Sequence, residues 1–195
     1  YDMDDIPDPA GLSRHVGALQ SAEISYGDMH LIDENGRSKG TTFFSGQQIP
    51  SRVDDPSVLL CRNFMGFTNT AIKREIIGPL AAVIPDGITA VDWWFYTNLL
   101  AEGFSAARTD GPVVAYRTHG QSTLGAGGTM DDKTLLRRCQ IMREHYALLS
   151  PSKEVRRADA AVERLTQMPA ITRAKLPAPP QPGVWYDDVS WACDQ

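Results

Sequence analysis

Three carboxylates, those of Asp2, Asp4 and Asp5, lie close together near the start of the chain. A helix is expected a few residues later, because Asp8 followed by Pro9 is typical of an N-cap and a first helical turn. Oxygen ligands spaced in this way suit a hard divalent cation such as Mg²⁺ or Mn²⁺. A solvated acidic turn in front of a helix has the same pattern, so the triplet alone leaves both interpretations open.

Two other interpretations of the acidic stretch can be compared with the sequence. A calcium-binding EF-hand loop that began at Asp2 would need glycine at its sixth position and glutamate at its twelfth. Those positions hold Pro7 and Ser13, so the EF-hand interpretation fails. A phosphatase of the haloacid dehalogenase type has a related motif after a strand. Here Ile6 follows Asp5 and no nucleophile context is visible, which leaves the phosphatase as a distant alternative.

A second candidate is Asp92, which stands at the expected start of a helix and precedes Trp93 and Trp94. A carboxylate flanked by bulky aromatic rings that exclude water and stack on a sugar is suited to act as a general base. The alternative is that Asp92 is a helix-start residue favoured by the helix dipole and that both tryptophans belong to the core. Taken alone, the local pattern favours this second interpretation.

A third group follows the apolar segment 112–116, whose β-branched residues predict a strand. Arg117 and His119 would lie at the carboxyl end of that strand. A guanidinium group binds phosphate oxygens and an imidazole binds metal or pyrophosphate, although isolated Arg and His residues at strand ends are more often surface groups. The remaining histidines, expected to be structural, are His15, His30 and His145.

The elements that must position these residues follow from the spacing of apolar side chains. Helical periodicity predicts four helices, over residues 8–19, 91–102, 135–149 and 158–168. Gly103 is expected to end the second helix. Alternation and turn signals predict a strand near 24–26 and a reversal at 34–36. Residues 41–55 are expected to form a surface loop, and the proline-rich stretch 176–182 a linker or tail.

The composition narrows the classes of function. The chain has 195 residues, of which 42% are hydrophobic, and this allows one domain with a substantial core. The formal charge of -5 and the lack of a basic cluster among aromatic residues argue against a nucleic-acid partner. Three widely spaced cysteines fit neither a disulfide framework nor a zinc site. No apolar run approaches the roughly 20 residues that cross a bilayer. We therefore expect a cytoplasmic protein, with association at the inner face of the membrane as an open alternative.

The order of these motifs resembles the C-terminal half of family 2 glycosyltransferases, and among them the bacterial rhamnosyltransferase-like branch. The motifs that carry the resemblance are, in order, DMDD, SYGDMHLIDENG, LLCRNFMGFTNTAIKRE, VDWWFYTNLLAEG and VVAYRTHGQSTLG. Together they span residues 1–125, and DWW with YRTHG after the acidic motif is far more specific than any one of them. Two departures occur, since Pro7 replaces a common tryptophan and Thr118 a common glutamine.

The resemblance implies an α/β fold of the GT-A type, in which a Rossmann-like mixed sheet lies between helices. Residues 1–125 would be the metal-binding and acceptor-side half of that domain, 126–170 a C-terminal helical extension and 171–195 a proline-rich tail. Because the chain starts at Tyr1, directly before the metal motif, we expect a nucleotide-binding half to precede it in the complete protein.

The resemblance also implies roles for individual residues. Asp92 would be the catalytic base. The residues expected to hold a divalent cation, Mg²⁺ or Mn²⁺, are Asp2, Asp4 and His119. Those expected to contact the diphosphate are Arg117 and Asp5. Those expected on the acceptor side are Asn63, Gly66, Thr68, Trp93 and Trp94.

The implied reaction is a metal-dependent transfer, with inversion, of a hexose or deoxyhexose from a nucleotide-diphosphate sugar to a hydroxyl group. The acceptor would be a glycan or a lipid-linked glycan in the synthesis of a cell-surface polysaccharide. The alternative is a truncated, inactive module that binds carbohydrate or serves assembly, since the nucleotide-binding half is not in this chain. In either case we expect the chain alone to be inactive.

Overall fold

The structure, a computed structural model, describes residues 3–78, 84–118, 131–177 and 183–194. Its strands form two four-stranded mixed sheets. The first sheet contains, in spatial order, β1 (Ile6–Pro7), β8 (Val114–Arg117), β3 (Met29–Ile32) and β4 (Ser38–Thr42). The second contains β5 (Arg52–Val53), β7 (Ala106–Arg108), β2 (Ile24–Tyr26) and β6 (Thr70–Ile72). At the centre of each sheet lies one parallel pair, β8 with β3 and β7 with β2.

The same two chain segments run through both sheets. β2 continues into β3, and β7 continues into β8 through residues 109–113. Where the segments cross, a Cβ added to Gly27 would lie 2.5 Å from Val113 Cγ1 and 2.7 Å from Thr109 Oγ1. Because real Cβ atoms do not approach other atoms so closely, this crossing requires glycine.

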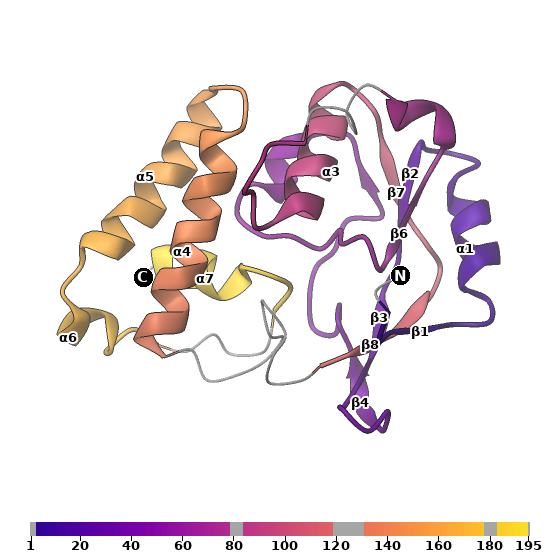
Figure 1. The fold of residues 1–195 in the computed structure, drawn as a ribbon, viewed down its shortest axis with the longest axis horizontal. Helices are drawn as coiled ribbons and strands as arrows, with labels where there is room; N and C mark the ends of the chain where they lie inside the picture. The colour runs from indigo at the N-terminus through magenta and orange to yellow at the C-terminus, as the bar shows by residue number, and fades with distance from the viewer. Residues whose placement is uncertain (1–2, 79–83, 119–130, 178–182, 195) are drawn as a thin grey trace.

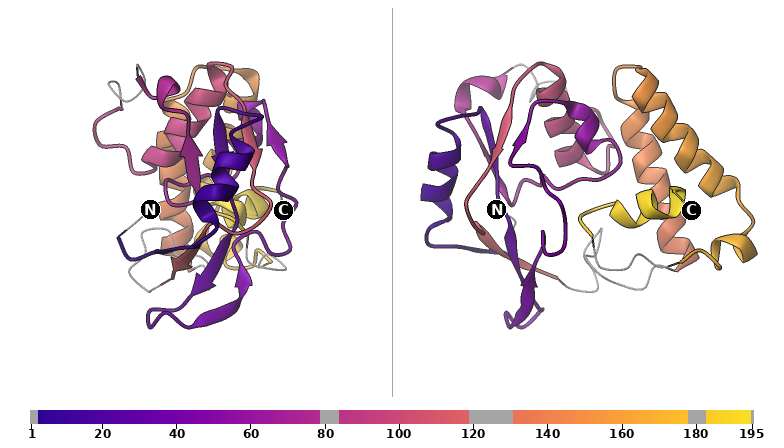
Figure 2. Two further views of the ribbon diagram at one scale, coloured as in Figure 1. Left: turned by 90° about the vertical axis from the view of Figure 1, so that its right-hand side faces the viewer. Right: turned by 180° about the vertical axis from the view of Figure 1, so that it is seen from behind.

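Helices cover the strands on both sides (Figures 1 and 2). α1 (Gly11–Ala18) lies on one side and α3 (Val91–Ala101) on the other. Beyond α3 stand α4 (Asp132–Ala147) and α5 (Lys153–Gln167), which pack against each other. Short helices follow at α6 (Ala170–Arg173) and α7 (Asp187–Cys193), and two 3-10 turns lie at Pro56–Leu59 and Arg74–Ile76. The predicted α/β class with mixed sheets and C-terminal helices is confirmed. In the described residues, no helix is both long and apolar enough to cross a membrane.

Trp93 lies at the centre of the core, on the face of α3 that meets the C-terminal helices. Its ring stacks on His145 of α4, with centroids 4.1 Å apart, and on Tyr186, with centroids 4.5 Å apart. Its Nε1 donates a hydrogen bond of 2.7 Å to the carbonyl of Leu59. A helix that is buried on nearly every side needs no polar face, which accounts for the run of apolar residues along α3.

The C-terminal segment differs from the predicted tail. Residues 183–194 fold back onto the domain, and Val184, Trp185, Tyr186 and Val189 are buried in its core. Asn63 and Trp185 pair as an antiparallel bridge, with the Asn63 N–H donating to the Trp185 carbonyl over 2.8 Å. The prediction of a tail rested on the prolines before this segment, but the aromatic residues after them supply enough apolar surface to be held in the core.

Several predicted helices agree closely with the structure, whereas the loop predicted over residues 41–55 does not. The helix predicted over 91–102 is α3, and Gly103 follows it with φ 91°. The two helices predicted beyond residue 131 are α4 and α5. The segment 41–55 is not only a surface loop, because β5 pairs with β7 and Phe43 and Phe44 are buried.

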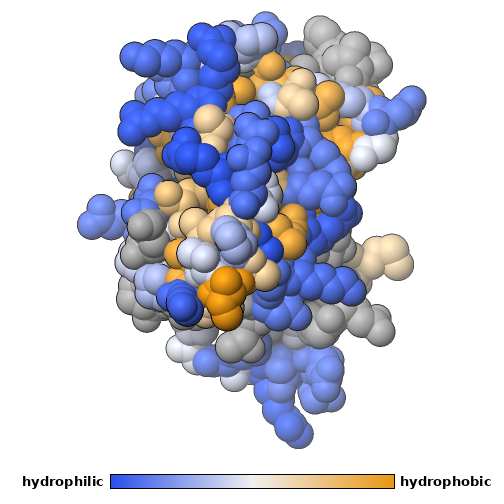
Figure 3. Space-filling model, turned by 90° about the vertical axis from the view of Figure 1, so that its left-hand side faces the viewer, coloured by the Kyte–Doolittle hydropathy of each residue, from blue (hydrophilic) through white to orange (hydrophobic). Residues whose placement is uncertain are grey.

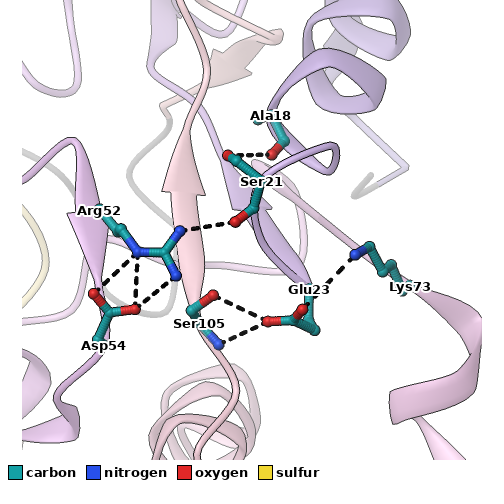
Figure 4. A network of polar contacts seen from close by, with 7 residues as sticks. All are labelled: Ala18, Ser21, Glu23, Arg52, Asp54, Lys73 and Ser105. Carbon is teal, nitrogen blue, oxygen red and sulfur yellow. Dashed lines mark hydrogen bonds and ion pairs between the residues drawn. The ribbon is translucent and has the colours of Figure 1, made fainter.

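A polar network ties together the ends of strands in the second sheet (Figure 4). Glu23, just before β2, accepts hydrogen bonds from Ser105 N (3.1 Å) and Ser105 Oγ (3.0 Å) and pairs with Lys73 at 3.7 Å. Arg52 of β5 donates to the carbonyl of Ser21 over 2.8 Å. The hydrogen bonds from Ser105, more than the charge of Lys73, hold the pKa of Glu23 below its usual value. The carboxylate therefore fixes the starts of β2 and β7 and the end of β6 relative to one another.

Candidate functional site

Asp92 lies in the first turn of α3 and is partly buried. Its Oδ1 accepts a hydrogen bond of 2.7 Å from the N–H of Trp93. A negative charge at this end of a helix is favoured by the helix dipole. This geometry is what a helix-start residue would show, and it also holds the carboxylate in one orientation, as a general base requires.

Gly66 is the point at which Asp92 meets two other parts of the chain. A Cβ added to Gly66 would lie 3.3 Å from Asp92 Oδ2 and 2.6 Å from Cη2 of Trp185. The glycine therefore leaves room for both the carboxylate and the indole. The structure brings the predicted base together with one predicted acceptor-side residue, and adds an aromatic residue from the C-terminal segment.

The loop that carries Gly66 is fixed by buried amides and hydroxyls. Asn69 Oδ1 accepts from Gly66 N over 2.8 Å, while its Nδ2 donates to the carbonyls of Gly27 (2.7 Å) and Phe64 (3.1 Å). Thr70 Oγ1 donates to the Gly66 carbonyl over 2.7 Å and is also hydrogen-bonded to Tyr96 OH, one helical turn after Asp92. These bonds make the loop a rigid support beside α3.

Asp5 connects the acidic stretch to this loop and to β8. Its Oδ2 accepts a hydrogen bond from Thr68 Oγ1, and its Oδ1 accepts one of 2.9 Å from the N–H of Arg117. The segment 66–68 therefore contacts Asp5 at one residue and lies against Asp92 at another. These hydrogen bonds bring together Asp5, Thr68 and Arg117, which are far apart in the sequence, and the roles that the resemblance implies for them stay predictions.

The Arg117 guanidinium group lies against main-chain carbonyl groups. Its Nε donates to the carbonyl of Asp4 over 2.9 Å, and its Nη1 donates to those of Asp33 (3.2 Å) and Glu34 (3.0 Å). Arg117 thus holds the acidic stretch and the turn between β3 and β4 at the end of β8. In this arrangement Arg117 and Asp5 stabilise the fold through hydrogen bonds. Their contact with a diphosphate stays a prediction.

The predicted metal site falls mainly outside the described residues, since these do not include Asp2 or His119. Asp4 is described and its side chain is exposed. Among the residues that the structure describes, no group of three or more His, Cys, Asp and Glu side chains is arranged to hold a metal ion. The expectation of a Mg²⁺ or Mn²⁺ site is not tested by this geometry.

The other predicted acceptor-side residues are largely buried. Asn63, Thr68, Trp93 and Trp94 are each 5% exposed or less. Trp93 and Trp94 belong to the core, which agrees with the alternative interpretation of Asp92 as a helix-start residue. Their rings have almost no exposed surface with which to contact an acceptor. Asn63 Oδ1 accepts from Met65 N over 3.0 Å and shapes the loop.

Two tyrosines, Tyr96 and Tyr186, lie close enough to Asp92 for its charge to change their pKa values. Burial is the main reason that the pKa of Tyr186 and the pKa of Tyr96 are raised, and the negative charge of Asp92 raises both further. Both phenols are therefore neutral over the whole physiological pH range. Sequence reasoning missed Tyr186 and Trp185, although an aromatic pair between Val184 and Val189 is a signal of a buried segment.

A separate groove of about 740 Å³ lies along α4 and α5, lined by residues that include Leu136, Arg143, Tyr146, Leu149 and Val155. Arg143 pairs there with Asp159 at 2.9 Å. On the α5 side of the molecule, hydrophilic side chains divide the apolar surface into small areas (Figure 3). None of the predicted site residues that the structure describes lines this groove.

Comparisons of the chain with known protein families, with curated proteins and with solved structures found no match. The arrangement of the residues around Asp92 and Asp5 therefore carries the functional argument.

Proposed function

We propose that this chain is the acceptor-side half of a GT-A glycosyltransferase that transfers a sugar, with inversion, from a nucleotide-diphosphate sugar to a hydroxyl acceptor. One observation carries the proposal. The segment 66–68 contacts the acidic motif through the Thr68–Asp5 hydrogen bond and lies beside the Asp92 carboxylate at Gly66. In a glycosyltransferase of this kind, the metal site and the general base would stand on either side of the reacting sugar, and a loop that lies against both Asp5 and Asp92 supports this assignment.

In the proposed reaction, Asp92 takes the proton of the acceptor hydroxyl as its oxygen attacks the anomeric carbon. The bond from that carbon to the diphosphate oxygen breaks, and the diphosphate leaves with the electron pair. The hydrogen bond from the Trp93 N–H, which restricts the orientation of the Asp92 carboxylate, supports this role. A single base is sufficient, because direct displacement requires no covalent sugar–enzyme intermediate.

The donor atoms of Asp2, Asp4 and His119 suit a hard divalent cation, with Asp4 exposed at the end of the acidic stretch. Such a cation, when bound, would neutralise the charge that develops on the departing diphosphate. The chain contributes the fixed position of Asp4, whose carbonyl accepts from Arg117 Nε over 2.9 Å.

The second candidate is a non-catalytic module that binds carbohydrate or serves assembly. The observation that favours it is the burial of Asn63 and Thr68, together with the hydrogen bonds that Asp5 and Arg117 make within the chain. In such a module the same contacts would only stabilise the fold, and Asp92 would only begin α3.

The test is an assay of the protein expressed from the complete reading frame that contains this chain. It is incubated with UDP-, GDP- and dTDP-sugars, with Mn²⁺ or Mg²⁺, and the release of nucleoside diphosphate is measured with and without hydroxyl acceptors. The proposal predicts release from at least one donor, its increase by an acceptor, and its loss in excess chelator. Release from no donor, or full activity in excess chelator, would contradict the proposal as stated.

A further inference from the structure

We infer that the C-terminal segment 183–189 forms one wall of the Asp92 site and that Trp185 is a positioning residue of the transfer reaction. This inference rests on the proposed function. It begins at Gly66, where the Asp92 carboxylate and the Trp185 indole approach the same point, at 3.3 Å and 2.6 Å from a Cβ placed there. The indole therefore limits the space into which the carboxylate and the loop could move.

The segment contacts both the loop that carries Gly66 and the start of α3. The Trp185 carbonyl accepts from Asn63 N over 2.8 Å, which attaches it to the loop that carries Gly66. The next residue, Tyr186, stacks on Trp93 with an angle of 19° between the rings, which attaches it to the first turn of α3 beside Asp92. Trp185 is thus fixed from two directions.

Tyr186 is held in an unfavourable backbone conformation. Its φ is 67°, and among the described residues it is the one non-glycine residue with positive φ. Its buried hydroxyl has no hydrogen-bond partner within the part of the chain that the structure describes. A strained residue with an unpartnered polar atom persists only where the surrounding packing fixes it, and such residues concentrate at functional sites. In this conformation the Tyr186 ring stacks on Trp93, whereas the Trp185 ring packs on Phe43.

Trp185 also reaches the strand that leads to Arg117. Its ring packs on Phe43 with centroids 4.6 Å apart and meets the edge of Tyr116 at 6.1 Å and 82°. Tyr116 directly precedes Arg117, which fixes the acidic stretch. The Trp185 side chain therefore lies between Gly66, beside Asp92, and Tyr116, beside Arg117, and in the proposed reaction its volume would set the spacing between the base and the leaving group. Loss of this spacing reduces turnover more than donor binding, because reaction depends on the alignment of the attacking hydroxyl.

The experiment compares Trp185→Ala, Trp185→Phe and the control Trp191→Phe in the protein from the complete reading frame. Trp191 lies in α7, and its Nε1 donates to the Pro177 carbonyl over 3.1 Å, outside the site. We expect Trp185→Ala to lower kcat about 10- to 100-fold with little change in the KM for the donor. Trp185→Phe should restore much of kcat, and Trp191→Phe should match the wild type. A kcat that is unchanged in folded Trp185→Ala would overturn the inference while the proposed function stands.

A second measurement does not depend on activity. Labelling of the Asp92 carboxyl group by a water-soluble carbodiimide and an amine is followed by mass spectrometry in the full chain. Trp185→Ala should raise the rate of labelling severalfold, because removal of the indole opens the space beside Gly66, and Trp191→Phe should leave it unchanged. If no donor is turned over by the wild type, the proposed function fails, and this labelling alone then decides whether Trp185 positions Asp92. Equal labelling in Trp185→Ala and the wild type refutes the positioning role.

Discussion

His145 gives the fold a dependence on pH whose size follows from its surroundings. The side chain is 1% exposed and stacks on Trp93, and among the described residues neither ring nitrogen has a hydrogen-bond partner. Burial lowers the pKa of His145 from 6.5 to about 3. The unfolded chain therefore takes up a proton as the pH falls below 6.5, and the folded protein does not take it up until the pH is near 3. The contribution of neutral His145 to the free energy of unfolding is fully present above pH 6.5 and is lost progressively as the pH falls from 6.5 towards 3.

The magnitude can be worked out for the interval from pH 7.5 to pH 5. Each pKa unit corresponds to about 1.36 kcal/mol, so protonation of this one histidine in the unfolded chain lowers the free energy of unfolding by about 2 kcal/mol. Burial also lowers the pKa of His15, to about 4, so His15 adds a loss in the same direction. The carboxylates with lowered pKa values, such as Glu23, act mainly below this interval.

The test is His145→Phe, which keeps a flat ring against Trp93 and removes both unpartnered nitrogens. Urea denaturation followed by tryptophan fluorescence gives the free energy of unfolding at pH 7.5 and at pH 5. The variant should lose about 2 kcal/mol less than the wild type over this interval and be at least as stable at pH 7.5. His30→Gln, at an exposed position of β3, serves as the control and should behave like the wild type. A pH dependence in His145→Phe as large as that of the wild type would refute the argument.

Two further changes test the packing of the site and of the helices. Gly66→Ala would place its methyl group against Trp185 and should lower the free energy of unfolding by about 1–3 kcal/mol. Gly17→Ala in α1, where no described atom lies within 4 Å of the added Cβ, should raise it by about 0.5–1 kcal/mol. Equal effects of the two variants in urea denaturation would contradict the predicted clash. Ser152→Ala removes the side-chain oxygen that accepts from Val155 N over 3.0 Å at the start of α5, and thermal unfolding should report a loss of about 1 kcal/mol. A neutral result would show that this N-cap does not stabilise the helix.

The long helices could be predicted because their signals are local. Residues 91–102 carry apolar side chains on all faces and Gly103 at the end, and α3 ends at Ala101. α4 and α5 combine an apolar stripe with side-chain caps from Asp131 and Ser152. Such elements are fixed by residues a few positions apart, so a single sequence contains the information.

The shorter strands and the C-terminal segment could not be predicted in this way. β1 has two residues and β7 three, and each is held by a partner strand far away in the sequence, as Ile6 is by Ala115. Trp185 and Tyr186 pack on Asn63 and Trp93, about 90 to 120 positions earlier in the chain. Local propensity carries no information about such contacts, and the preceding prolines suggested a tail.

For the site, the sequence named candidate residues but not their contacts. Asp5, Thr68 and Arg117 belong to three separate motifs, and the hydrogen bonds of Asp5 that join them became visible only in the structure. The sequence also did not indicate that the Arg117 guanidinium group donates three hydrogen bonds to main-chain carbonyl groups. Two of these bonds depend on the turn at Asp33 and Glu34, which is far from Arg117 in the sequence. The tryptophans after Asp92 are core residues, since the rings of His145 and Tyr186 cover both faces of Trp93.

The measurement that tests the central claim most directly is the transfer rate of Asp92→Asn in the protein from the complete reading frame. Asparagine keeps the shape of the side chain and can still accept the hydrogen bond from the Trp93 N–H, but it cannot remove a proton from the hydroxyl group of the sugar acceptor. If Asp92 is the general base, the turnover number falls by about two to four orders of magnitude, while calorimetry shows unchanged affinity for the nucleotide sugar. Turnover close to that of the wild type would contradict the claim and leave Asp92 as a helix-start residue.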